Sequence, residues 1–188
     1  MTRTVKVLLT LLAISTCALT NGQTASVIAN GKFDDMSGWK FNTPSNGSVE
    51  ILTGQLIVTG VNRDEGEIVP HMEAATVYAY QEIEVTKPGS LTFQLISYTS
   101  SDTNCNDYPV FVLNDNLLKL YEDGTVESSS SSREKQICNG FATGNTITYI
   151  VKLQPGKHKV GLGVHTIDGY YGKGVAVFDN VMFIPEKK

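Results

Sequence analysis

The chain has 188 residues, of which 41% are apolar and 18% charged, with 17 glycines, 6 prolines and a formal net charge of −4 at pH 7. This composition is that of one globular domain and excludes a coiled coil, a collagen and a disordered tail. The first 22 residues contain Arg3 and Lys6 but no acidic residue, so a chain that begins at Gln23 carries −6. A mildly acidic protein without a basic run is a poor partner for nucleic acid or for an anionic membrane.

The N-terminus has the pattern of an export signal. A short basic start precedes an apolar run of 13 residues, Val7–Leu19, and a polar stretch with small residues. The run is shorter than the ~20 residues that a helix needs to span a bilayer. We therefore predict a signal peptide over residues 1–22, cut after Gly22 or alternatively after Ala18, and a mature chain without a transmembrane segment. A competing hypothesis is lipidation at Cys17, because the residues before it loosely match a bacterial lipobox.

Runs of β-forming residues recur along the mature chain, residues 23–188, which we predict to be a single domain. No window of helical length shows a 3.6-residue apolar period, whereas apolar and polar residues alternate clearly in several runs. In chain order, the predicted strands are Ser26–Ala29, Trp39–Phe41, Val49–Leu52, Leu56–Val61, Ala75–Val85, Leu91–Tyr98, Tyr108–Leu113, Leu117–Tyr121, Thr146–Leu153, Lys159–His165 and Gly174–Ile184. About ten strands at this spacing predict an all-β fold, an antiparallel two-sheet β-sandwich or jelly roll.

Turn signals separate these runs at Pro88-Gly89, Asn114-Asp115-Asn116 and Pro155-Gly156. The segment 122–136 contains five consecutive serines and is predicted to be an exposed, flexible loop between two strands. The alternative for this segment is a modified or adhesive tract.

Two cysteines, Cys105 and Cys138, remain once the signal is removed, in a compartment predicted to be oxidising. We predict that they form a disulfide. In the loop-entropy model, closing this loop would stabilise the fold by roughly 3–4 kcal/mol. A metal site or a catalytic thiol would call for a CxxC spacing or a nearby histidine, which the sequence does not offer.

Two polar loops flanked by tyrosines, Thr99–Asp107 and Thr166–Lys173, are the candidate binding site. If both loops leave the same end of the sandwich, they form one cleft in which polar groups grip a sugar while an aromatic ring stacks on its apolar face. The candidate ligand-binding residues are Tyr98, Asp102, Tyr108, Asp168, Tyr170 and Tyr171. The alternative is that these aromatic residues cap the core and that the loops are ordinary connections.

Two segments at opposite ends of the chain carry a family resemblance. Asn30–Trp39, with the sequence NGKFDDMSGW, resembles the opening of secreted jelly-roll domains of the galactose-binding-like superfamily, which include calcium-containing carbohydrate-binding modules. Gly174–Phe183, with the sequence GVAVFDNVMF, resembles their closing strand. The resemblance implies a carbohydrate ligand. At its position in this motif Trp39, the only tryptophan, is predicted to pack in the core rather than to serve as a sugar platform.

The resemblance also implies a structural calcium site. If the first and last strands are neighbours, Asp34 or Asp35 and Asp179 converge with backbone carbonyl groups near Asn30 and Lys32. Such a cage would supply the oxygen ligands that Ca²⁺ takes at about 2.3–2.6 Å. The alternative is that these aspartates start a turn or bond to backbone donors, with no metal.

The supply of catalytic residues argues against an enzyme. The three histidines, His71, His158 and His165, lie far apart in the sequence, and no GxSxG, HExxH or phosphate-binding glycine pattern occurs. Carboxylate pairs such as Glu82 and Glu84 are not diagnostic, because the pairing that matters in glycoside hydrolysis is spatial. A small hydrolase would need at least two carboxylates that converge in a pocket.

Asn46 lies in an Asn-Gly-Ser sequon and is a candidate N-glycosylation site if the source is eukaryotic. Taken together, the sequence predicts a secreted, non-catalytic carbohydrate-binding module that acts at the cell surface or in the extracellular matrix. The alternative is a structural or adhesive extracellular protein that binds other proteins rather than sugar.

Overall fold

The computed structural model describes residues 27–44, 46–61, 74–100, 107–128, 137, 146–167 and 174–187. These residues form eleven strands, and no helix among them has the length and apolar character that a membrane span requires. The strands are β1 (Lys40–Asn42), β2 (Ser48–Leu52), β3 (Gln55–Thr59), β4 (Ala75–Val85), β5 (Gly89–Thr99), β6 (Asp107–Leu113), β7 (Asn116–Leu120), β8 (Val126–Ser128), β9 (Ile147–Leu153), β10 (Gly156–Thr166) and β11 (Val175–Pro185).

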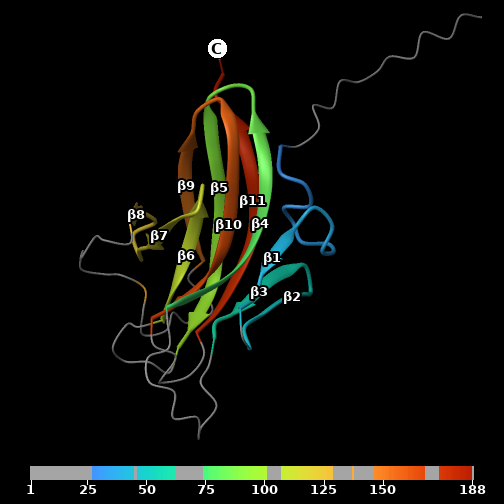
Figure 1. The fold of residues 1–188 in the computed structure, drawn as a ribbon. Coiled ribbons are helices and arrows are strands. Elements are labelled where there is room, and N and C mark those ends of the chain that lie inside the picture. The colour runs from blue at the N-terminus through green and yellow to red at the C-terminus, as the bar shows by residue number, and fades with distance from the viewer. Residues whose placement is uncertain are drawn as a thin grey trace, which may run out of the picture.

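The strands build two antiparallel sheets. The six-stranded sheet has the order β1-β4-β10-β6-β7-β8, and the five-stranded sheet has the order β2-β3-β11-β5-β9. Figure 1 shows the long strands β4, β5, β10 and β11 running along the long axis of the molecule, with β4 paired to β10 in one sheet and β5 paired to β11 in the other. The predicted antiparallel two-sheet β-sandwich is therefore confirmed.

The core lies between the two sheets and takes alternate residues from the long strands, as the period of two predicts, whereas all three residues of the edge strand β1 are exposed. At its centre the Phe93 ring of β5 stacks on Phe111 of β6 and on Tyr149 of β9, in both cases at 5.1 Å between ring centroids. Phe178 of β11 meets Phe93 edge-on at 6.5 Å. Because each fully buried ring of this kind stabilises the fold by about 1.5–3 kcal/mol, this cluster is a main link between the sheets.

Two tight hairpin turns have positive φ at both central residues, Thr53-Gly54 between β2 and β3, and Asn114-Asp115 between β6 and β7. Their backbone twist matches that of the flanking strands and fixes the register of each hairpin. The turn predicted at Asn114-Asp115-Asn116 is confirmed.

Two of the predicted elements differ from the structure. The strand expected at Ser26–Ala29 is wrong for its described residues, which form bends and turns because the backbone groups of Ala29 bond to the side chain of Gln81 instead of to a neighbouring strand. Conversely, Val126–Ser128 in the expected loop 122–136 forms β8, since Val126 pairs with Leu120 and packs against the core.

Several predictions concern residues outside the described part of the chain. They are the signal peptide over 1–22, lipidation at Cys17 and the disulfide between Cys105 and Cys138. They stay predictions from the sequence.

Candidate functional site

The strand register brings the two predicted binding loops to one end of the sandwich. Thr166 at the end of β10 lies opposite Asp107 at the start of β6, and Val175 at the start of β11 lies opposite Thr99 at the end of β5. The β5–β6 and β10–β11 connections therefore leave the sandwich at the same end. The candidate ligand residues in these connections are Asp102, Asp168, Tyr170 and Tyr171, and all four lie outside the described residues.

Tyr98, expected at the surface beside one of these loops, lies in the core with 0% of its surface exposed. The cause is a bulge in β5, where Leu95 lies opposite Phe178 and Ser97 lies opposite Val177, so that Ile96 is an extra residue. An extra residue reverses the alternation of side chains, and it turns Tyr98 toward the other sheet. The expected surface position of Tyr98 is thus corrected.

A second group of aromatic side chains lies on the outer face of the six-stranded sheet, away from the core. Tyr108, Val110 and Val112 of β6 form a cluster there that is separate from the core, with Tyr78 and Leu117 packed against it. We call this side of the sheet the tyrosine face and define it by the residues of the six strands and of the β6–β7 turn that point away from the core. Its three members from β6, Tyr108, Val110 and Val112, are nevertheless buried. They are Lys40, Asn42, Thr76, Tyr78, Tyr80, Glu82, Glu84, Tyr108, Val110, Val112, Asp115, Leu117, Lys119, Glu127, Lys157, Lys159 and His165.

Two glycines at the middle of β10 leave room for the rings. Gly161 lies opposite Tyr80, and Gly163 lies opposite Tyr78. A Cβ on Gly163 would stand 2.5 Å from the Tyr78 Cβ and would overlap the carbonyl oxygen of Val77. A Cβ on Gly161 would stand 3.2 Å from the Tyr78 ring. The Tyr78 ring therefore packs closely against the backbone of β10 at Gly161 and Gly163.

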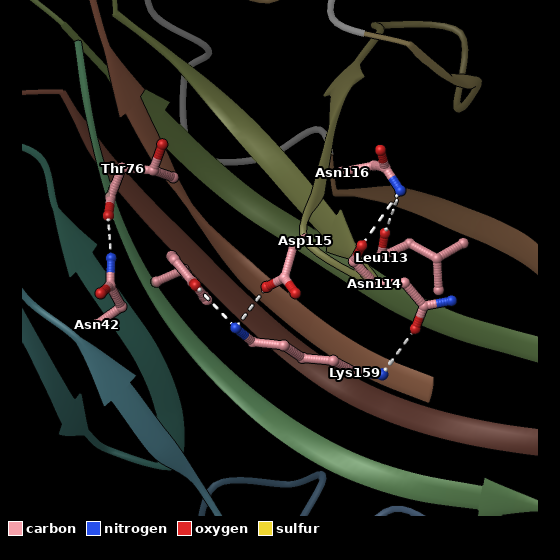
Figure 2. Close-up of polar contacts among 8 residues, drawn as sticks. Asn42, Thr76, Leu113, Asn114, Asp115, Asn116 and Lys159 are labelled. Atoms are coloured by element: carbon pink, nitrogen blue, oxygen red, sulfur yellow. Dashed lines mark hydrogen bonds and ion pairs between the residues drawn. The ribbon is translucent and has the colours of Figure 1, made fainter. Parts of the chain in front are cut away.

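Lys159 of β10 connects the tyrosines to the β6–β7 turn. Its Nζ atom donates hydrogen bonds to the Tyr78 hydroxyl at 3.1 Å and to Asp115 Oδ1 at 2.6 Å, and it lies 4.4 Å from the centre of the Tyr80 ring. Its backbone nitrogen donates to Asn114 Oδ1 at 3.0 Å, a bond that Figure 2 shows beside the ion pair with Asp115. The two side-chain hydrogen bonds raise the pKa of Lys159, and the bond with Asp115 has the larger effect. The result is a fixed cation between two rings.

At the loop end of the same face Tyr108 is covered rather than open, with 4% of its surface exposed. Lys119 Nζ lies 5.0 Å from the centre of its ring, and the His165 ring lies 5.2 Å away. His165 Nδ1 is 2.8 Å from Thr76 Oγ1. Burial, and to a lesser extent Lys119, lowers the pKa of His165, and burial raises the pKa of Tyr108. Tyr108 was expected to be a surface ring and is instead packed under a lysine side chain.

At the opposite end of the face, β4 and β10 enclose a shallow depression of about 380 Å³. Its walls carry charged side chains from both strands. It is lined by Glu82, Ile83, Glu84, Lys157, His158 and Lys159.

The N-terminal loop, residues 27–39, lies against the last strand, as the calcium prediction requires. The Val181 amide donates to the carbonyl oxygen of Gly31 at 2.8 Å. Trp39 is 6% exposed and packs on Phe33 at 5.1 Å between ring centroids, so its predicted place in the core is confirmed.

Two of the oxygen atoms offered for calcium in this loop, the Asn30 carbonyl oxygen and Asp35 Oδ1, accept hydrogen bonds from the chain. The Asn30 carbonyl oxygen accepts from the Phe33 amide and from Trp39 Nε1. Asp35 Oδ1 accepts from Asn30 Nδ2 at 2.9 Å and from the Ser37 amide at 2.7 Å, and its hydrogen bonds to Ser37 lower the pKa of Asp35.

The remaining predicted ligands are Asp34, Asp179 and Lys32. The Asp34 amide donates to Asn30 Oδ1 at 3.0 Å, and Asp179 Oδ1 accepts from the Asn180 amide at 2.6 Å. Lys32 is exposed in the same loop. Among the described residues no group of three or more His, Cys, Asp or Glu side chains is placed to hold a metal. Calcium binding at these residues stays a prediction from the resemblance.

Asn46 is exposed in a turn between β1 and β2, where the Gly47 amide donates to the Pro44 carbonyl oxygen at 3.2 Å. This position is accessible to a modifying enzyme. Glycosylation of Asn46 stays a prediction.

Comparison with known proteins gives only distant matches. No family model and no curated protein matches the chain. The chain is similar to a solved structure titled "CBM4 structure and function", with 10% identity over 82% of this chain and 99% of that chain and a TM-score of 0.43. It is also similar to a CBM28 carbohydrate-binding module specific for non-crystalline cellulose, with 14% identity, coverage of 85% and 95%, and a TM-score of 0.40. An exo-beta-agarase matches with 12% identity, coverage of 87% and 26%, and a TM-score of 0.42. At TM-scores below 0.5 these likenesses carry no argument about function.

Sequence reasoning did not single out Tyr78 and Tyr80. Both lie at the outward positions of β4, which alternate with the buried positions of Val77 and Ala79. Aromatic residues at two successive outward positions were the signal that could have found this face.

Proposed function

We propose that this chain is a carbohydrate-binding module that holds a glycan on the tyrosine face. The observation that carries the proposal is the pair formed by Tyr78 and Tyr80, two half-buried rings on the outside of a sheet with 5.6 Å between their centroids. A sugar ring presents an apolar C–H face that packs on an aromatic ring and a rim of hydroxyl groups that need hydrogen-bond partners. Paired outward tyrosines supply the first of these needs.

Polar groups around the rings supply the second. Lys159 contacts both rings, Asp115 accepts a hydrogen bond from it, and Asn42 lies opposite Tyr78 on the neighbouring strand β1. Asn42 Nδ2 donates a hydrogen bond to the Thr76 carbonyl oxygen at 2.7 Å (Figure 2). This bond fixes the orientation of the Asn42 side-chain amide. Side chains that are already fixed lose little conformational entropy when a ligand binds.

The proposal includes export through the predicted signal peptide and the absence of catalytic activity. The sequence resemblance to secreted carbohydrate-binding modules supports both. Incubation of the purified chain with each bound glycan is expected to release no reducing ends, and any sustained release would contradict the non-catalytic part of the proposal.

The experiment for binding is a glycan array with the mature protein, followed by titration of the best uncharged polysaccharide against single variants. Tyr78→Ala and Tyr80→Ala are each expected to weaken binding about tenfold, equivalent to ~1.4 kcal/mol, because each removes a ring at the centre of the contact. The matched control is Ile150→Ala, which truncates an exposed apolar side chain on the five-stranded sheet. Equal affinities for the tyrosine variants and the control would refute the assignment of the ligand to this face.

The rival function, contact with other proteins, draws support from a different surface. On the outer side of the five-stranded sheet Ile150 is 61% exposed and Met182 is 48% exposed, and both lie opposite Thr92. If this rival holds, Ile150→Ser weakens attachment to a protein-coated surface while Tyr78→Ala does not, and free glycan fails to compete.

A further inference from the structure

The charges on the tyrosine face are arranged in pairs. At one edge Lys40 Nζ lies 3.0 Å from Glu82 Oε2, and near the rings Lys159 Nζ lies 2.6 Å from Asp115 Oδ1. Two further lysines have a carboxylate directly across the sheet. Lys157 lies opposite Glu84 in the β4–β10 ladder, and Lys119 lies opposite Glu127 in the β7–β8 ladder. Each lysine that the structure describes on this face thus has an acidic neighbour.

The formal charge of the face follows directly. Over its described residues the face carries four lysines and four carboxylates. The nearby His165 adds no fixed charge near pH 7, since burial and Lys119 lower its pKa. The face is therefore polar and neutral, whereas the whole chain carries −4.

A neutral face of this kind favours one class of glycan. Sulfated or uronic-acid polysaccharides gain most of their affinity from unpaired cations. Here Lys40 and Lys159 already hold a carboxylate, and Lys157 and Lys119 each have one directly across the sheet that repels an incoming anion. A hydroxyl group both donates and accepts hydrogen bonds, so it can bond to a lysine and to the adjacent carboxylate without breaking their pair. A polymer of uncharged sugars offers a row of such groups.

We propose that the tyrosine face selects an uncharged polysaccharide and discriminates against polyanionic ones. This inference rests on the proposed carbohydrate-binding function and names its ligand class. The paired charges act as a filter: they supply hydrogen bonds to hydroxyl groups while presenting no net field to an approaching chain.

The test compares two sets of probes on the mature protein. The uncharged set is mixed-linkage β-glucan, xylan and galactomannan, and the anionic set is heparin, polygalacturonate and carrageenan. Titration calorimetry at about 20 mM and about 300 mM NaCl measures each affinity and its dependence on screening. We expect at least one uncharged polysaccharide to bind with less than a twofold change between the two salt concentrations, and no anionic one to bind more tightly than it.

A pair of matched variants tests the cause. Glu82→Gln releases Lys40 on the tyrosine face, and Glu186→Gln releases Lys152 from a similarly exposed ion pair on the five-stranded sheet. Both variants change the net charge by the same amount. We expect Glu82→Gln to raise the affinity for an anionic probe about threefold or more at low salt, and Glu186→Gln to leave it unchanged.

The outcomes separate the two proposals. Salt-independent binding of an uncharged probe, with the gain confined to Glu82→Gln, supports the inference. Tighter binding of an anionic probe to the unmodified protein, with a steep loss at high salt, overturns the inference and leaves carbohydrate binding in place. Equal gains in both variants overturn the role of the paired charges on this face. If no probe of either set binds, both proposals fail.

Discussion

The Val181 amide donates a 2.8 Å hydrogen bond to the carbonyl oxygen of Gly31. The two backbones lie so close that a Cβ on Gly31 would overlap the Val181 carbonyl oxygen. The two residues belong to the two segments that carry the family resemblance. The Asn-Gly motif near the N-terminus and the Asp-Asn-Val motif near the C-terminus therefore meet in space, and their glycine is required by sterics.

This contact predicts the effect of Gly31→Ala. The added methyl group has no space without moving β11, so we expect the free energy of unfolding to fall by about 1–3 kcal/mol. Urea denaturation followed by far-UV circular dichroism measures it. Lys32→Ala, at the exposed neighbouring position, is the control and should unfold at the urea concentration of the unmodified protein. Similar midpoints for both variants would show that the contact is not needed.

A second prediction concerns Gln81, a buried polar side chain of β4. Its Oε1 accepts from the Ala29 amide at 3.0 Å and its Nε2 donates to the Ala29 carbonyl oxygen, which joins the N-terminal loop to the six-stranded sheet. Gln81→Leu leaves both backbone groups of Ala29 without these partners, at an expected cost of about 1–3 kcal/mol. Limited proteolysis should then cut within residues 27–39 more rapidly than in the control Gln55→Leu. Unchanged cleavage would mean that the loop is held by other contacts alone.

A third prediction is a loss of stability in weak acid that depends on His165. The pKa of His165 is lowered in the folded protein from its ordinary value of 6.5, so the folded state binds this proton less readily than the unfolded chain. Its contribution to stability is present above about pH 6.5 and is lost as the pH falls below that value. The melting temperature should fall between about pH 7.5 and pH 5.

The fall should be smaller in His165→Gln and unchanged in His158→Gln, which removes a histidine that bonds to the Gln154 carbonyl oxygen at the other end of β10. Nuclear magnetic resonance titration of the His165 ring gives a direct reading. A pKa of 6.5 or higher in the folded protein would contradict the prediction.

A fourth prediction is that chelation leaves the protein unchanged. The Asn30 carbonyl oxygen and Asp35 Oδ1 each accept hydrogen bonds from donors of the chain itself, so we expect the N-terminal loop to keep its shape without a metal. We expect the same melting temperature in EDTA and in millimolar CaCl₂. A fall of several degrees in EDTA, restored by calcium but not by magnesium, would instead support the calcium site that the resemblance implies.

The sequence was sufficient for the fold because alternation and turn residues act locally. In strands such as β4 and β9, the alternation of apolar and polar residues identifies the buried face within a few residues. The Asn114-Asp115 turn is formed by residue types that readily adopt positive φ. Which side chains of β5 face the core after Ile96 could not be predicted, because the bulge at Ile96 depends on the pairing of β5 with β11. That single extra residue is what moved Tyr98 from the expected binding site into the core.

The candidate site was harder to predict because it is assembled across strands. Tyr78, Lys159 and Asp115 meet only through the order β4-β10-β6 and the turn that follows β6. The spacing of residues within a single segment does not predict that these three side chains meet. Of the residues predicted to bind ligand, Tyr108 does lie on this face, but under Lys119 rather than open to solvent.

The bond between Gly31 and Val181 joins residues 150 positions apart, and it therefore has a consequence for the order of folding. Closing so long a loop costs chain entropy, so the bond between the N-terminal loop and β11 forms only once β11 has joined the sheet. Until then the apolar side chains of Ile28 and Phe33 have no core to enter. The first segment of the sandwich to be synthesised is thus expected to be the last to dock, and the first to be released when the protein unfolds.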